Sequence, residues 1–248
     1  MRRLYRFMPW LRHGLLFLFL GSAAKANAQE QSKVRLPTGE HVPLIEIKST
    51  TDKSAPLLIG LHGYGMDENQ MATLVNPALG FECNYIAIRG FVSLGKGEFA
   101  WFPIRETSAG PEINAEDIEE SITKLNVTIK ALIERYKPSG VYLIGYSQGA
   151  GLAYSYAWQA LPEIKGIAAF SGTLLNEVSG SFDKPLPFFT GHGNFDSLIS
   201  QEEILKTKAT LEAAGARVSF HAYNVPHVVS KRGRTDLAAW LGTLIEKK

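Results

Sequence analysis

Cysteine is almost absent from this sequence. Cys83 is the single cysteine among 248 residues, so no disulfide can form within the chain. It precedes an apolar run at 85–88, where a small buried residue is expected rather than a redox site. A chain of this length can bury a core large enough to be stable without cross-links.

Internal repeats, low-complexity tracts and a large charge excess are also missing. Hydrophobic residues make up 45% of the chain and charged residues 20%, and the formal net charge is +2. This composition predicts one globular domain. The positive charge comes from the first 28 residues. The remaining chain is mildly acidic and has no general electrostatic attraction to nucleic acid or anionic membranes, so neither is an expected partner.

The first 28 residues differ from the rest of the chain. Four arginines within residues 2–12 precede an apolar run at 15–20, and small residues lead to Ala26-Asn27-Ala28. This pattern is typical of a secretory signal peptide, so we predict cleavage after Ala28 and a secreted or periplasmic domain at 29–248. A membrane anchor is the alternative, but the uncharged stretch at 14–24 has 11 residues, whereas about 20 are needed to span a bilayer. Cleavage would remove five basic residues and no acidic ones, which changes the net charge from +2 to −3.

Short apolar runs alternate with amphipathic stretches along the remaining sequence. Apolar residues at three- and four-residue spacing predict a long helix over 113–136. Alternation of strands and helices predicts an α/β fold, with a mostly parallel central sheet covered by helices on both faces. Expected strands cover 42–47, 57–61, 85–88, 141–144, 167–170, 186–189 and 218–223, and the other expected helices cover 150–160, 202–214 and 237–245. In such sheets, ligands bind beyond the carboxyl ends of the strands, so functional residues should directly follow strands.

A candidate nucleophile follows one of these strands. The pentapeptide Gly145-Tyr146-Ser147-Gln148-Gly149 has the G-x-S-x-G pattern between an expected strand and an expected helix. Its glycines permit a sharp turn, which would lift the Ser147 hydroxyl clear of the sheet at the N-terminus of the helix. The context favours a catalytic serine over a surface turn that matches the pattern by chance.

A serine nucleophile needs a base, and the base needs a carboxylate that orients it. His227 follows the last expected strand, whereas His41 precedes the first strand and His221 lies within a strand. Asp196 follows the strand at 186–189, and the order serine, aspartate, histidine occurs in hydrolases with this pentapeptide. The alternatives are a surface-loop histidine and a solvated turn aspartate.

Two backbone N–H groups are candidates for stabilising the oxyanion. Gln148 directly follows the nucleophile, and Tyr64 lies in the glycine-rich segment Leu61-His62-Gly63-Tyr64-Gly65 after an earlier strand. His62 is interpreted as a residue that braces this loop, because no second ligand at metal-like spacing accompanies it. We expect neither a metal nor a cofactor.

These segments together resemble the α/β-hydrolase superfamily and, within it, the phospholipase/carboxylesterase family that includes the acyl-protein thioesterases. The resemblance extends from about Leu57 to the end of the chain, in family order. It implies an α/β-hydrolase fold, a triad of Ser147, Asp196 and His227, and an oxyanion hole from the N–H groups of Tyr64 and Gln148. The matching segments are 61–65, 101–102, 145–149, 170–172, 191–196 and His227.

The sequence departs from the family pattern near the expected pocket. Pro103 stands where the family often has an acidic residue, and Asn224-Val225-Pro226 replaces the usual glycine-rich approach to the histidine. Trp101 and Phe102 lie in a long stretch, 91–112, without a clear element, and we predict that they line a pocket for an apolar or aromatic group of the substrate. The alternative is that these aromatic residues fill the core beside the long helix.

The function predicted from the sequence is a secreted serine hydrolase that cleaves small-molecule carboxylic esters through an acyl-enzyme. A serine peptidase or a polyester depolymerase would use the same chemistry, and a hydrolase-fold binding protein without turnover is the alternative from another class. Little chain remains for a large lid, which argues against an interfacial lipase. We expect a monomer or a homodimer, with no stable membrane anchor after signal cleavage.

Overall fold

The computed structural model describes residues 29–245, except residues 53, 76–80, 109 and 177. The predicted signal peptide, residues 1–28, lies outside the described residues. Among the described residues, no helix is both long enough and apolar enough to cross a membrane.

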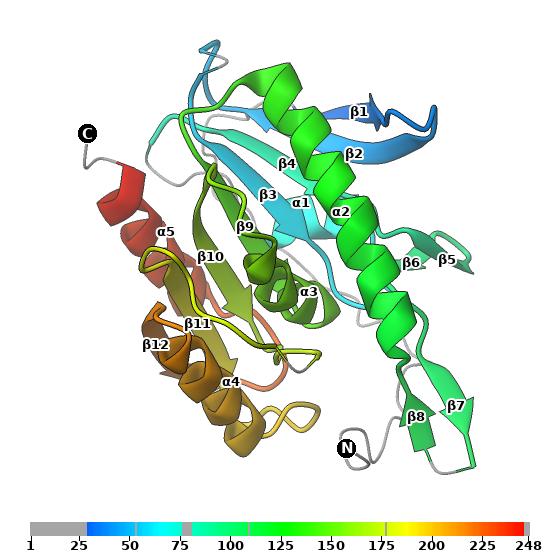
Figure 1. The fold of residues 1–248 in the computed structure, drawn as a ribbon, viewed down its shortest axis with the longest axis vertical. Helices are drawn as coiled ribbons and strands as arrows, with labels where there is room; N and C mark the ends of the chain where they lie inside the picture. The colour runs from blue at the N-terminus through cyan, green and yellow to red at the C-terminus, as the bar shows by residue number, and fades with distance from the viewer. Residues whose placement is uncertain (1–28, 53, 76–80, 109, 177, 246–248) are drawn as a thin grey trace.

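An eight-stranded sheet forms the centre of the molecule, as Figure 1 shows. All neighbouring strands from β4 to β12 are parallel, while β2 is antiparallel to both of its neighbours. The sheet is therefore mixed but mostly parallel, which confirms the predicted fold class. In spatial order the strands are β1 (Gln29–Arg35), β2 (His41–Lys48), β4 (Asn84–Ile88), β3 (Leu57–Leu61), β9 (Val141–Tyr146), β10 (Ile164–Phe170), β11 (Pro187–Gly193) and β12 (Arg217–Tyr223).

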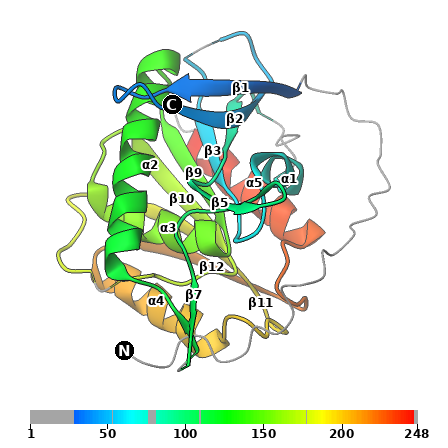
Figure 2. The same cartoon turned by 90° about the vertical axis from the view of Figure 1, so that its right-hand side faces the viewer.

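Helices cover both faces of the sheet (Figures 1 and 2). On one face lie α2 (Ala115–Tyr136), α3 (Gln148–Tyr156) with the short 3₁₀ helix η1 (Ala157–Gln159), and α4 (Gln201–Ala213). On the other lie α1 (Glu68–Leu74) and α5 (Lys231–Ile245). Each face carries its own apolar cluster, so the sheet is buried on both sides, as parallel sheets usually are.

The long helix α2 follows the predicted apolar pattern. Its buried face includes Ile118, Ile122, Leu125 and Ile129, at the three- and four-residue spacing of one helix side. The helix ends where Lys137 adopts a left-handed conformation, with φ 47° and its N–H donated to Ile133. Cys83 is fully buried, as expected, and burial raises the pKa of its thiol to about 11.

Six short or polar elements were not predicted. Strand β1 exposes most of its side chains and buries only Val34, and helix α1 is only seven residues long. The stretch 91–112 forms two hairpins of three- and four-residue strands. They are β5 (Val92–Gly95) with β6 (Glu98–Ala100), and β7 (Arg105–Thr107) with β8 (Gly110–Glu112).

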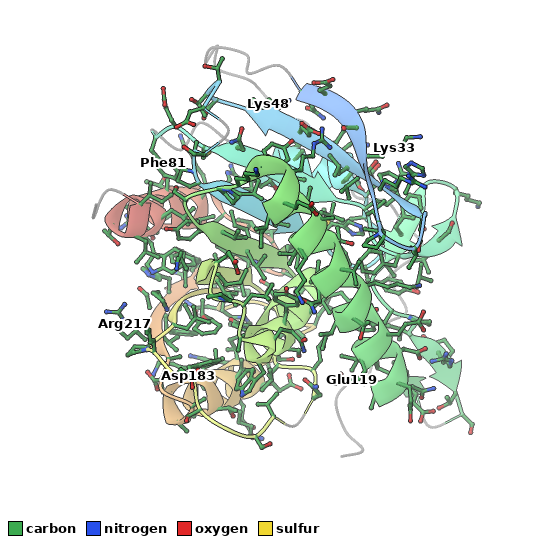
Figure 3. All side chains as sticks on the ribbon, turned by 45° about the horizontal axis from the view of Figure 1, so that its top comes forward. Lys33, Lys48, Phe81, Glu119, Asp183 and Arg217 are labelled. Carbon is green, nitrogen blue, oxygen red and sulfur yellow. The ribbon has the colours of Figure 1, made fainter. Side chains whose placement is uncertain are left out.

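Charged side chains surround this layered core. Figure 3 shows Lys33 and Lys48 at the β1–β2 side of the sheet and Arg217 at the β12 side, all three exposed. The loops that follow β3, β9, β11 and β12 carry the predicted site residues, so the parallel strands bring them to one edge of the sheet.

Candidate active site

Ser147 forms the tip of the turn between β9 and α3. Its backbone has φ 54° and ψ −116°, a conformation that residues other than glycine rarely adopt. Its N–H donates to the Phe170 carbonyl oxygen at 2.9 Å, which ties the turn to the end of β10. The neighbouring structure therefore holds Ser147 in a strained conformation, as is common at functional sites.

Close backbone contacts explain both glycines of the pentapeptide. A Cβ at Gly145 would lie 2.4 Å from the Gly149 carbonyl oxygen, and a Cβ at Gly149 would lie 2.2 Å from that of Leu61. Neither position can hold a side chain without moving the backbone. The sharp strand-to-helix turn thus depends on glycine at both places.

The structure brings the three predicted triad residues together. His227 Nε2 lies 2.9 Å from Ser147 Oγ, and His227 Nδ1 lies 2.7 Å from Asp196 Oδ2. Ser147 follows β9, Asp196 follows β11 and His227 follows β12. This chain of hydrogen bonds can activate a serine hydroxyl, with the Nδ1 proton directed to the carboxylate.

The Asp196 carboxylate is fully buried and accepts three hydrogen bonds. Oδ1 accepts from the backbone N–H groups of Leu198 and Ile199 at 2.9 and 3.0 Å, and Oδ2 accepts from His227. Burial alone would raise the pKa of this carboxyl, but the hydrogen bonds and the nearby His227 outweigh burial and lower the pKa below its ordinary value. Asp196 is therefore ionised at neutral pH.

The loop that carries His227 is fixed by two contacts. Tyr146 Oη donates to the His227 carbonyl oxygen at 2.7 Å. Gly193 permits close approach on the other side, because a Cβ there would lie 2.4 Å from the carbonyl oxygens of Val225 and Pro226. Together these contacts hold the loop after β12 against the ends of β9 and β11.

Both predicted oxyanion segments lie beside Ser147. Gln148 is the first residue of α3, where backbone N–H groups have no acceptor within the helix. The Tyr64 loop is also near Ser147, because a Cβ at Gly63 would lie 3.3 Å from Ser147 Cβ. Gly65 N–H donates to the Phe99 carbonyl oxygen at 2.9 Å and anchors this loop. The roles of the Tyr64 and Gln148 N–H groups remain predictions.

His62 braces the loop, as predicted. It is fully buried, its Nε2 accepts from Gly90 N–H at 2.8 Å, and its Nδ1 lies 2.7 Å from the Gly63 carbonyl oxygen. Burial lowers the pKa of His62, and the two contacts fit a neutral ring protonated at Nδ1. In the part of the chain that the structure describes, no group of three or more His, Cys, Asp or Glu residues could hold a metal ion.

The prediction that Trp101 and Phe102 line a substrate pocket needs correction. Their exposed fractions are 0% and 1%, and both belong to the apolar cluster under α2 and α3. Trp101 Nε1 donates to the His62 carbonyl oxygen at 2.8 Å. The structure therefore matches the alternative, in which the large apolar rings fill the core beneath the site.

The Gln148 side chain has a role that was not predicted from the sequence. Its Oε1 accepts from Trp101 N–H at 2.9 Å, and its Nε2 donates to the Phe102 carbonyl oxygen at 2.8 Å. These bonds connect the start of α3 to the 101–102 segment, which in turn holds the His62 loop. No local pattern in the sequence could reveal them, because the partners are backbone groups 46 and 47 residues away.

Comparisons with known proteins identify the family of the chain. The family profile described as Phospholipase/Carboxylesterase matches residues 43–245. Lysophospholipase-like protein 1 of Mus musculus is 24% identical over 231 residues, covering 84% of this chain and 94% of its own. Acyl-protein thioesterase 1 of Saccharomyces cerevisiae is 29% identical over 107 residues, covering 40% of this chain and 47% of its own.

Solved structures show the same fold. The crystal structure of the Bacillus cereus carboxylesterase superposes with a TM-score of 0.70 at 24% identity, covering 82% of this chain and 94% of the esterase. The profile match, which spans most of the chain, establishes the relationship on its own. The chain therefore belongs to the phospholipase/carboxylesterase family of α/β-hydrolases.

Proposed function

We propose that the protein is a secreted serine esterase that hydrolyses carboxylic esters through an acyl-enzyme on Ser147. The observation that carries this proposal is the hydrogen-bonded chain from Ser147 Oγ through both ring nitrogens of His227 to Asp196 Oδ2. A pure binding protein would have no need for a strained serine, a basic ring nitrogen and a buried carboxylate in this order.

Acylation begins when Ser147 Oγ attacks the ester carbonyl carbon while His227 Nε2 takes the hydroxyl proton. The carbonyl oxygen becomes an oxyanion, for which the N–H groups of Tyr64 and Gln148 are the proposed donors. The bond from carbon to the alcohol oxygen then breaks, and His227 gives its proton to the leaving alcohol. Deacylation repeats these steps, with water as the nucleophile and Ser147 as the leaving group.

Asp196 supports this cycle by remaining ionised. Its lowered pKa keeps a negative charge beside His227 Nδ1, which stabilises the imidazolium formed in each half-reaction. The Leu198 and Ile199 N–H groups hold the other carboxylate oxygen and fix the direction of Oδ2. Asp196 thereby selects the ring tautomer in which Nε2 is free to accept the serine proton.

Exposed apolar side chains close to Asp196 in the sequence support an ester with an apolar group. Among the described residues, the exposed large hydrophobic side chains are Phe195, Leu198 and Leu205, all within one stretch that includes Asp196. The mouse relative is named as lysophospholipase-like and the yeast relative as an acyl-protein thioesterase. Export would separate this protein from acylated cytosolic proteins, so we favour small-molecule esters.

A fluorophosphonate probe tests the nucleophile. We expect wild-type protein to be labelled on Ser147 and Ser147→Ala to remain unlabelled, because the probe reacts with an activated serine hydroxyl. The control is circular dichroism of the variant, which should match the wild type. Failure of the wild type to label, or labelling that persists in Ser147→Ala, would refute the nucleophile assignment.

A turnover panel tests the substrate class. Esters, thioesters and amides of matched acyl groups, from acetyl to palmitoyl and including aromatic acyl groups, are compared by kcat/KM. We expect esters to be the best substrates. Faster turnover of amides would favour a peptidase, cleavage of polyester films would favour a depolymerase, and labelling without turnover of any class would contradict the esterase proposal.

Export is tested separately from the hydrolytic activity. We propose that residues 1–28 direct secretion and are removed after Ala28. Mass spectrometry of protein recovered from the periplasm or culture medium of an expressing bacterium should show an N-terminus at Gln29. Recovery of only the full-length chain inside the cytoplasm would contradict this part of the proposal.

A further inference from the structure

A second histidine lies beside the triad without a described role. His192, near the end of β11, is 2% exposed. Its Nδ1 has no hydrogen-bond partner among the described residues, although it lies 4.0 Å from Asp196 Oδ2. A buried polar nitrogen without a partner is uncommon, because its desolvation is uncompensated.

The Asp196 carboxylate has room for one more donor on this side. Oδ1 accepts two backbone hydrogen bonds, whereas Oδ2 accepts only the bond from His227. An ionised carboxylate oxygen can accept two hydrogen bonds. The nearest further donor that the structure records for Oδ2 is His192 Nδ1, at a distance slightly too long for a hydrogen bond.

His192 is suited to donate without adding charge. Burial and the proximity of His227 lower the pKa of His192, although Asp196 acts in the opposite direction. A neutral ring carries one N–H, which can hold a carboxylate in place but cannot neutralise it. Asp196 therefore keeps the negative charge that His227 needs.

We propose that His192 is a positioning residue of the triad, whose Nδ1–H faces Asp196 Oδ2 and closes on it as His227 takes the serine proton. This inference rests on the proposed function of Ser147. Hydrogen bonds in catalytic sites are often long in the free enzyme and shorten when charge develops. Two donors on Oδ2, one from each histidine, would then fix the carboxylate in line with His227.

Replacing His192 by Asn and by Leu separates donation from packing. The Asn side-chain N–H reaches about the position of Nδ1–H, while Leu has a similar volume and no donor. We expect His192→Leu to lower kcat about tenfold, as for loss of a hydrogen bond to a charged group, with KM changed less than about twofold. His192→Asn should recover most of that loss. Equal kcat in the two variants, or an unchanged kcat in His192→Leu, would overturn the proposal.

Two further variants control for misfolding and for general disturbance of the buried residues around His192. His192→Gln carries the same amide as Asn one bond further out, so Asn should exceed Gln in kcat even if Leu fails to fold. Ser171 is the matched control, because it directly follows Phe170, which pairs with Gly191 next to His192. Its buried Oγ also has no partner among the described residues. Ser171→Ala should leave kcat unchanged, and a loss equal to that of His192→Leu would contradict a specific role.

Fluorophosphonate labelling distinguishes failure of the proposed function of Ser147 from failure of the proposed role of His192. If wild-type protein does not label, both the proposed function and the role of His192 are refuted. If wild-type protein labels and the labelling rates of His192→Asn and His192→Leu are equal, only the role of His192 fails. We expect the Leu variant to label more slowly than the Asn variant, with both labelled at Ser147.

Discussion

The two residues that flank Ser147 both fix parts of the site that lie far away in sequence. Tyr146 donates to the His227 carbonyl oxygen, and the Gln148 amide bonds to the backbone of Trp101 and Phe102. The variable positions of the G-x-S-x-G pattern are therefore not interchangeable in this chain. Each connects the nucleophile turn to another loop at the carboxyl edge of the sheet.

Tyr146→Phe tests the first of these connections. The variant keeps the ring and removes only the donor to His227, so we expect kcat to fall about two- to tenfold with little change in KM, as for the loss of one hydrogen bond. Steady-state kinetics on one ester measure the change. Tyr142→Phe, on the same strand, is the control and should behave as wild type. Identical kcat values for the two variants would show that the Tyr146 hydroxyl does not position His227.

Asp196→Asn tests the ionised carboxylate through activity and through stability. An amide cannot select the productive tautomer of His227, so kcat should fall about 10⁴-fold.

Folding lowers the Asp196 pKa below its ordinary value of 3.8, so the stabilising contribution of the ionised carboxylate is fully present above that value and is lost as pH falls through the folded pKa. Urea unfolding at about pH 7 and pH 3 should show a larger loss of stability for wild type than for the variant. Equal losses would mean that the Asp196 pKa is not lowered in the folded protein.

At the scale of elements, the sequence predicts those helices and strands whose buried residues form a clear apolar pattern. Helix α2 and the central strands carry long apolar patterns, and all were predicted within a few residues. Strand β1 could not be found this way, because its edge position leaves only Val34 buried and backbone pairing with β2 holds it. Trp101 was misassigned for a related reason, since an aromatic residue in an irregular segment has the same sequence pattern in a core and in a pocket.

Two glycine substitutions test how tightly these elements pack. Gly149→Ala would place a Cβ 2.2 Å from the Leu61 carbonyl oxygen, a backbone group that cannot move alone. We expect a loss of about 3 kcal/mol in the free energy of unfolding. Gly242→Ala in α5 meets nothing within 4 Å and should stabilise by about 0.5–1 kcal/mol, because alanine favours helix. Urea unfolding measures both, and a stability of Gly149→Ala equal to wild type would contradict the packing argument.

At the scale of the whole molecule, the buried core accounts for stability without disulfide cross-links. The buried layers on both faces of the sheet supply the core, and Cys83 is enclosed within one of them. The sequence predicted this arrangement from composition and alternation alone. It could not predict which surface meets the substrate, because exposure depends on how loops from β3, β11 and β12 pack together.

The exposed ring of Phe195 gives a test of substrate preference. Phe195 is 66% exposed and directly precedes Asp196. We expect an apolar acyl chain held at Ser147 to cover part of its ring. Burying about half of such a side chain contributes about 1 kcal/mol, which corresponds to about a fivefold change in kcat/KM. We therefore expect Phe195→Ser to lower kcat/KM about fivefold for a decanoyl ester through KM, and to leave an acetyl ester unchanged because its acyl group is too short to reach the ring. An equal loss on both esters would indicate that Phe195 acts on the triad itself, and no loss on either would mean that the acyl chain leaves the site in another direction.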